Sequence, residues 1–203
     1  MGLRERKKLA AREALSWAAL KLAMENGPEN VRVEQIAAEA GVSPRTFNNY
    51  FSSKEEAICA IGVDRQERIR SALLARPADE PLWDAVISSV LEQYGGEPDR
   101  EQVARVRLQM RHSSLQGEHL KARAAIERVL AEGIAERIGV DIRIDMYPSL
   151  VAGAVSSATR VAMDHWLNSG TEQRLVPLLT EALRAVAAGL PEPLPPRRKK
   201  PPC

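Results

Sequence analysis

The sequence predicts an all-α fold, and three observations support this prediction. Apolar residues recur at spacings of three and four along most of the chain, as they do on one face of a helix. Ala, Leu, Glu, Lys and Arg, all good helix formers, dominate the segments between Gly and Pro. No segment shows the alternation of apolar and polar residues that is typical of a strand. The composition, with 44% hydrophobic and 28% charged residues, is that of an ordinary globular protein.

The first three helices have clear ends. The first helix is predicted to stop near Asn26-Gly27-Pro28, and a short second helix begins at Val33 and ends at Gly41. Ser43 is a preferred N-cap, and Pro44 suits the first position of the third helix because that position needs no backbone N–H.

The rest of the chain predicts longer helices. Ser53 and Glu56 have the spacing of a capping box, from which one helix is expected to continue to a stop before Pro77. Further helices are predicted from Pro81 to Tyr94, at 99–114, at 118–138 after a break at Gly117, from Asp145 to Leu167, and from Thr171 and Arg174 to Gly189. Residues 191–203 are rich in Pro and basic side chains and predict an extended, disordered tail.

Charge and cysteine content narrow the function classes. Residues 1–54 carry 9 basic and 6 acidic side chains, which suits a polyanionic partner, whereas residues 55–190 are net acidic. Cys59 and Cys203 suggest no disulfide framework, so a reduced, cytoplasmic protein is expected. We find no signal peptide and no stretch that approaches the ~18 apolar residues needed to span a membrane.

Residues 33–50 read as helix, glycine-containing turn and helix, which is the helix-turn-helix layout. On a helical wheel Phe47, Tyr50 and Phe51 share one side of the second of these helices. The opposite, polar side carries Arg45, Thr46, Asn48 and Asn49. Arg and Asn can each form two hydrogen bonds with a base edge, to guanine and adenine respectively. A solvated helix pair with a polar outer face is the alternative, and periodicity alone does not exclude it.

Residues near the ends of this helix and at the start of the chain are candidates for backbone contacts. Phosphates pass the ends of a recognition helix, where Ser43, Pro44, Tyr50 and Lys54 lie. A flexible basic start could add phosphate or minor-groove contacts through Arg4, Lys7 and Lys8, with Arg6 and Arg12.

The amino-acid sequences of two segments resemble the signature of a known family. Residues 33–47, with the Gly-Val-Ser turn, and residues 50–58, with Phe-Ser-Ser-Lys-Glu-Glu, look like the signature of the TetR (tetracycline repressor) family, and the likeness covers about residues 8–62. Asn48 departs from the family's pattern, which usually has an aromatic residue there that touches the DNA backbone. The resemblance implies a three-helix DNA-binding domain at residues 1–52, here called the head, and a helical ligand-binding and dimerisation domain at residues 53–190, the body. It also implies a double-stranded DNA operator and a homodimer built from the last two long helices.

The sequence agrees with a homodimer. Residues 150–158 are small and apolar nearly all round, so this helix must be buried on more than one side. The last predicted helix adds further apolar residues, Leu175, Val176, Leu178, Leu179, Leu183 and Val186. One helix pair in a monomer could not cover all of this surface.

The body is expected to bind a small, mostly apolar ligand, because such sites have apolar and aromatic linings. The candidates are Trp83, Tyr94, Met110, Tyr147, Met163 and Trp166, with Arg107, Arg111 and His112 as polar contacts. For any one of the first six, a role in core packing is as well supported as a role in lining a pocket. The ligand is expected to tilt the helix that begins at Ser53 and so to change the distance between two recognition helices.

We predict neither a metal site nor a cofactor. His112 and His119 are seven residues apart across Gly117, and no histidine has a Cys or His four residues further on. The alternative to a ligand-responsive regulator is an enzyme or a protein-interaction module that uses the body. Against the enzyme, no arrangement of catalytic residues is recognisable.

Overall fold

The computed structural model describes residues 3–94, 99, 103, 112–169 and 173–191, and for residues 3–6 the backbone alone. Every regular element in these ranges is a helix, which confirms the all-α prediction. The elements, with η for a 3₁₀ helix, are α1 (Leu3–Asn26), η1 (Pro28–Asn30), α2 (Val33–Glu39), α3 (Pro44–Asn48), α4 (Lys54–Cys59), α5 (Ile61–Ala75), α6 (Leu82–Glu92), η2 (Ser113–Leu115), α8 (Gln116–Ile138), α9 (Tyr147–Asn168) and α10 (Leu175–Ala187). None of the helices in the described ranges has the length and apolar character that crossing a membrane requires.

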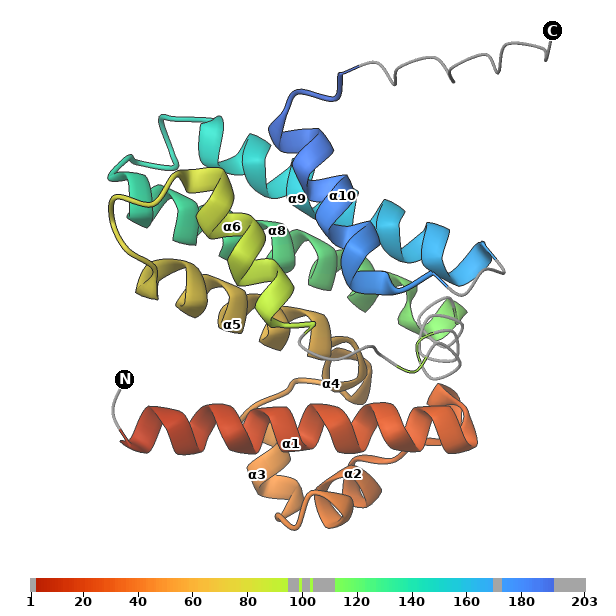
Figure 1. Cartoon of the computed structure of the whole chain (residues 1–203). Coiled ribbons are helices and arrows are strands. Elements are labelled where there is room, and N and C mark those ends of the chain that lie inside the picture. The colour runs from red at the N-terminus through yellow and green to blue at the C-terminus, as the bar shows by residue number, and fades with distance from the viewer. Residues whose placement is uncertain (1–2, 95–98, 100–102, 104–111, 170–172, 192–203) are drawn as a thin grey trace, which may run out of the picture.

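The head is organised around α1, which crosses the molecule beneath the body (Figure 1). α2 packs against α1 and α3 packs against α2, both on the side of α1 that faces away from the body. α1 stops as predicted, because Gly27 adopts φ 81 and Pro28 follows it. The side chains of Leu15, Ile36 and Phe47 are buried together in the core of the head.

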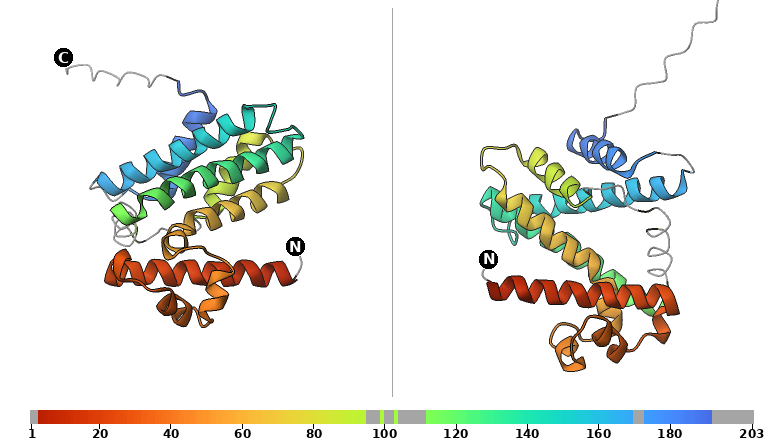
Figure 2. Two further views of the ribbon diagram at one scale, coloured as in Figure 1. Left: turned by 180° about the vertical axis from the view of Figure 1, so that it is seen from behind. Right: turned by 60° about the horizontal axis from the view of Figure 1, so that its bottom comes forward.

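The body is a layered bundle of α5, α6, α8, α9 and α10, with α10 on the side furthest from α1 (Figure 2). α5 and α8 lie side by side and come close where glycines remove side-chain bulk. A Cβ atom at Gly62 of α5 would lie 2.9 Å from Ile126 Cδ1 of α8, and one at Gly133 of α8 would lie 2.8 Å from Arg70 Cγ of α5. A larger residue at either glycine would require the facing side chain, or the helix that carries it, to shift.

The helix predicted from Ser53 to Pro77 is two helices, so that prediction was wrong. α4 ends at Cys59, and the N–H of Ala60 bonds to the carbonyl of Ala57, three residues back, at 3.4 Å. Ala60 is 3% exposed and packs in the core of the head, and Gly62 follows it against Ile126. The break is therefore set by packing between distant segments, which sequence periodicity does not report.

Other helix ends also differ from the prediction. Gly117 lies inside α8, which begins at Gln116 and ends at Gly139 in the left-handed conformation. α10 begins at Leu175 with Arg174 as its N-cap, and Thr171 lies outside the described residues. Most of the helix predicted at 99–114 also lies outside them, as does the tail after residue 191.

Residues of the body complete the core of the head, those of α4 among them and also a leucine far along the chain. Leu115, at the end of η2, is fully buried among head residues, and Ala122 of α8 packs against the same core. η2 also lies against η1 of the head. The head and body therefore share a continuous apolar contact in addition to the chain connection through α4.

Candidate DNA-binding surface and ligand region

The turn between α2 and α3 fixes the direction of the recognition helix. Gly41 adopts φ 70, which an L-residue with a side chain rarely adopts, and the N–H of Val42 bonds back to Ala37 at 2.9 Å. Ser43 then caps α3 as predicted, since its hydroxyl accepts the N–H of Thr46 at 3.1 Å. The hydroxyls of Ser43 and Thr46 also lie 2.9 Å apart, so Thr46 is tied to the cap.

α3 has one buried and one polar face. Phe47 is 1% and Phe51 2% exposed, and their ring centroids lie 5.6 Å apart in the core of the head. Arg45, Asn48 and Asn49 are exposed. Thr46 and Tyr50 are half-buried, and Ser43 and Pro44 are exposed at the start of the helix. The segregation that the helical wheel predicts is therefore present, and three hydrogen-bonding side chains are presented to solvent.

Lys54 makes contacts within the head. Its Nζ donates to the carbonyls of Glu29, at 2.9 Å, and Val31, at 2.8 Å. These bonds tie the start of α4 to the segment between α1 and α2. Lys54 Nζ also lies 4.0 Å from Glu55 Oε1, so a phosphate would compete with this carboxylate for the third hydrogen, and that contact stays a prediction.

The start of the chain is helical in the structure, not the flexible arm that the sequence predicted. α1 begins at Leu3, and Lys7 and Lys8 are exposed on it, whereas the side chain of Arg4 lies outside the description. Arg12 pairs with Asp64 of α5, and its guanidinium carbon lies 4.9 Å from the ring centroid of Phe51. Burial lowers the pKa of Arg12 from its usual value, an effect that nearby carboxylates oppose.

The residues predicted to bind a ligand do not all meet. Tyr94 and Met163 pack with Trp166, which is 2% exposed, in an apolar group here called the Trp166 cluster. Its buried members are Ala162, Trp166, Leu175 and Leu179. Trp83 lies eleven residues before Tyr94 and packs against the core formed by α5, α6, α8, α9 and α10, which Tyr94 contacts as well. Arg107, Met110 and Arg111 lie outside the described residues.

Tyr147 and His112 lie apart from the Trp166 cluster. Tyr147 is 43% exposed in the first turn of α9, and the sixteen residues to Met163 correspond to about 24 Å of helix. A compact ligand cannot touch both ends of such a helix. His112 faces the head, where its Nε2 lies 3.4 Å from Glu29 Oε2 and its Nδ1 lies 3.0 Å from Ser114 Oγ.

Sequence reasoning missed two polar residues of α5. Arg65 donates to the hydroxyl of Tyr94 at 3.2 Å, and its guanidinium carbon lies 5.0 Å from the centroid of that ring. Gln66 is 7% exposed, and its side-chain Nε2 has no hydrogen-bond partner among the described residues. The signal was a polar residue three and seven positions before Ile69 and Leu73, on the apolar stripe of the helix.

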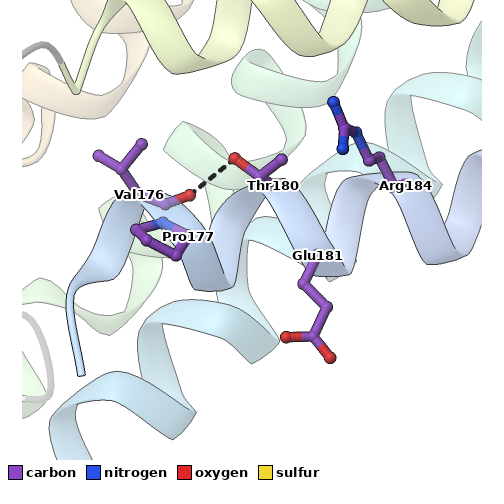
Figure 3. Close-up of a pocket in the computed structure, with 5 residues that line it drawn as sticks. All are labelled: Val176, Pro177, Thr180, Glu181 and Arg184. Atoms are coloured by element: carbon purple, nitrogen blue, oxygen red, sulfur yellow. Dashed lines mark hydrogen bonds between the residues drawn. The ribbon is translucent and has the colours of Figure 1, made fainter.

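A hollow of about 530 Å³ lies on the outer side of α10 (Figure 3). It is lined by residues of this helix alone, namely Val176, Pro177, Thr180, Glu181 and Arg184. The buried face of α10 carries Leu175, Leu179 and Leu183 instead. The hollow is therefore separate from the Trp166 cluster and shares no residue with the predicted ligand region.

The chain is similar to known bacterial regulators in sequence. The sequence model described as bacterial regulatory proteins of the tetR family matches residues 17–58, and the model of the MftR C-terminal domain matches residues 80–191. The HTH-type transcriptional regulator TcmR of Streptomyces glaucescens is 34% identical over 173 residues, which are 81% of this chain and 76% of TcmR. The fatty acid metabolism regulator protein of Bacillus subtilis is 24% identical over 85% of this chain and 92% of its own length.

Solved structures share the fold. FadR of Bacillus subtilis, in complex with stearoyl-CoA, has a TM-score of 0.53 at 22% identity and covers 87% of this chain and 97% of its own. SmeT, the repressor of the Stenotrophomonas maltophilia multidrug efflux pump SmeDEF, has a TM-score of 0.54 at 17% identity and covers 91% and 97%.

These matches decide between the alternatives that the sequence left open. The family and the curated relatives are transcriptional regulators and not enzymes. The head carries the helix-turn-helix that the family model describes, and the second model spans most of the body. The chain belongs to the TetR family of bacterial transcriptional regulators.

Proposed function

We propose that this regulator is a repressor that binds a near-palindromic operator as a homodimer and is released by a small, mostly apolar ligand. The observation that carries the proposal is the polar face of α3. Arg45, Asn48 and Asn49 are exposed on it, while Phe47 and Phe51 anchor the other face in the core. A short helix held in this way can enter a major groove with its polar side chains toward the bases.

The proposal assigns a role to each polar residue of the head. Arg45, Asn48 and Asn49 contact base edges, and Thr46, held by Ser43, contributes from the first turn. Phosphate contacts come from Ser43, Pro44, Tyr50 and Lys54 around α3 and from Arg4, Lys7 and Lys8 of α1. At position 48 this chain has an amide where the family usually has an aromatic residue that touches the DNA backbone. We therefore assign a base contact to Asn48.

The homodimer rests on an exposed apolar stripe along α9. Met146 is 72%, Leu150 60% and Val161 54% exposed, and these residues lie on one side of the helix with Gly153, Ala154 and Ser157 between them. The hollow on α10 is a second surface that a partner could contact. A stripe of this length is more apolar than a solvated helix face, and a second copy of the chain would cover it.

The ligand is proposed to bind at the Trp166 cluster. Tyr94, Met163 and Trp166 supply aromatic and polarisable surface. We assign the polar contact to Gln66 of α5, whose buried Nε2 has no partner among the described residues. An apolar molecule with one hydrogen-bond acceptor would match this set. Two relatives of the fold are a fatty acid regulator and a complex with stearoyl-CoA, which is in keeping with an apolar ligand.

Binding to DNA tests the repressor proposal directly. The purified chain is titrated onto the DNA upstream of its own gene and onto a random duplex of equal length, at about 0.15 M salt. We expect a preference for the upstream DNA of 10³ or more, which is about the lower end for specific regulators. Equal affinity for the two duplexes would refute specific repression. It would favour a helical interaction module instead.

A further inference from the structure

One face of α5 contacts the end of α6. The guanidinium of Arg65 donates to the Tyr94 hydroxyl at 3.2 Å and lies over the ring. One turn further on, Arg68 Nε donates to Gln93 Oε1 at 3.1 Å. Tyr94 also packs against the Trp166 cluster, so Arg65 contacts a residue of the proposed ligand site and Arg68 contacts the residue before it.

The same face of α5 contacts α1 of the head. Asp64 pairs with Arg12, and Asp64 Oδ2 lies 3.1 Å from the hydroxyl of Ser16, which is fully buried. Arg68 reaches α1 as well, since its Nη1 donates to Glu13 Oε1 at 2.7 Å. Arg68 is four residues after Asp64 and three after Arg65, so on the helix surface it is a neighbour of both.

We propose that Asp64, Arg65 and Arg68 form a polar bridge that couples the end of α6 to α1 and through it to the recognition helix. The last step is the contact of Arg12 with Phe51, whose ring packs against Phe47 of α3. This inference rests on the proposed function, because it names the route by which a ligand at Tyr94 would change the DNA-binding head.

The break at Ala60 explains why such a bridge is needed. α4 and α5 are separate helices that meet at Ala60, and the proposal is that a tilt of α5 does not pass into the head as the movement of one rigid rod. The ion pair between Arg12 and Asp64 links α1 directly to α5, beyond the break between α4 and α5. Its side chains are 26% and 10% exposed, so salt screens them less than the pair between Arg68 and Glu13, at 44% and 41%.

Hydrogen–deuterium exchange on the full-length protein, without DNA or ligand, tests the bridge. Tyr94→Phe removes only the hydroxyl that Arg65 contacts. We expect amides of α1 around Ser16 to exchange about two- to tenfold faster, as follows from the loss of one hydrogen bond that restrains them. Ser89→Ala is the matched control, because it also removes a hydroxyl from α6, one bonded to Ala85 O at 2.7 Å within the helix. It should leave α1 unchanged.

A second variant separates coupling from general loosening. Asp64→Asn breaks the head end of the bridge, and we expect faster exchange in α1 that Tyr94→Phe does not increase further. If the two substitutions together speed exchange in α1 by the product of their separate effects, the proposal is overturned. It is also overturned if α1 of Tyr94→Phe exchanges as fast as α1 of the wild type.

Exchange in the presence of DNA keeps the two proposals distinguishable. The duplex that binds in the gel shift should slow exchange at the end of α6 in the wild type and not in Asp64→Asn, because coupling between two sites is reciprocal. Slowing of equal size in both proteins would overturn the bridge while specific DNA binding stands. If no duplex binds specifically, the proposed repressor fails, and the measurement on the free protein still decides whether the bridge exists.

Discussion

Arg137 of α8 donates a hydrogen bond to the backbone carbonyl of Leu73, 3.0 Å away in the last turn of α5. The same guanidinium reaches three further carbonyls in the segment that follows, those of Arg76, Pro77 and Glu80, at 3.3, 2.6 and 3.0 Å. Carbonyls at the end of a helix lack partners within it, and here a side chain of the neighbouring helix supplies them.

Arg137→Met is therefore expected to destabilise the body by about 2 kcal/mol, because it removes the charged donors and keeps the apolar stem. Urea unfolding followed by circular dichroism measures this. Arg143→Met is the control, since Arg143 is exposed and pairs only with Asp141, and the midpoint should not move. Equal midpoints for wild type and Arg137→Met would show that water replaces these bonds without loss.

Arg45→Ala is expected to relax sequence specificity and to weaken operator binding by about 1–3 kcal/mol, the range for a side chain that reads a base. Arg45 is exposed on α3 and the substitution removes no contact of the core, so folding should be unaffected. Fluorescence anisotropy with the operator and with single-base variants measures both effects. A uniform loss across all duplexes would assign Arg45 to a phosphate.

Lys54→Met tests a residue with two predicted effects. Loss of the bonds to Glu29 O and Val31 O should lower the unfolding midpoint. Loss of a phosphate contact should also reduce the slope of log affinity against log salt by about one. Lower stability with an unchanged slope would place the role of Lys54 in the fold alone.

Leu150→Glu and Val161→Glu place charges on the exposed stripe of α9 and are expected to give monomers. Sedimentation at micromolar concentration should find a dimer for the wild type and half its mass for the variants. Leu120→Glu is the matched control, because Leu120 is 66% exposed and belongs to α8 and not to α9 or α10. A wild-type protein that sediments as a monomer would contradict the homodimer.

Gln66→Leu is expected to raise the free energy of unfolding by about 1 kcal/mol, because it replaces a buried amide, whose Nε2 has no partner among the described residues, with an apolar group of similar size. Ligands that raise the melting temperature of the wild type and carry a hydrogen-bond acceptor should bind the variant more weakly. A destabilised variant would indicate that the amide has a partner in the free protein.

The sequence predicts the head better than the body for a physical reason. The ends of α1 and α3 depend on local chemistry, namely Gly27 with Pro28 and the hydroxyl of Ser43, and a neighbour three residues away is enough to decide them. The recognition face follows from Phe47 of α3 and Phe51, three residues after its end, which are both buried in the core. These features need no knowledge of distant segments.

The errors come from contacts between segments far apart in the chain. The break at Ala60 depends on packing near Ile126, and Arg12 is drawn from the expected DNA surface to Asp64. Aromatic residues indicate that a surface is apolar, but not which surface each residue joins. Tyr147 was therefore grouped with Trp166, although the two lie at opposite ends of α9. Gln66 was overlooked because a single polar residue does not disturb the helical period.

The burial of Leu115 in the head has a consequence for modularity. A fragment that stops at residue 52 would keep the helix-turn-helix and lose both α4 and the leucine that fills its core, leaving a void lined by apolar side chains. A chimera that joins this head to another body would have the same void unless the new body places an apolar side chain where Leu115 lies. The unit of folding here is therefore larger than the unit of DNA recognition, and heat should melt the two regions in one cooperative transition.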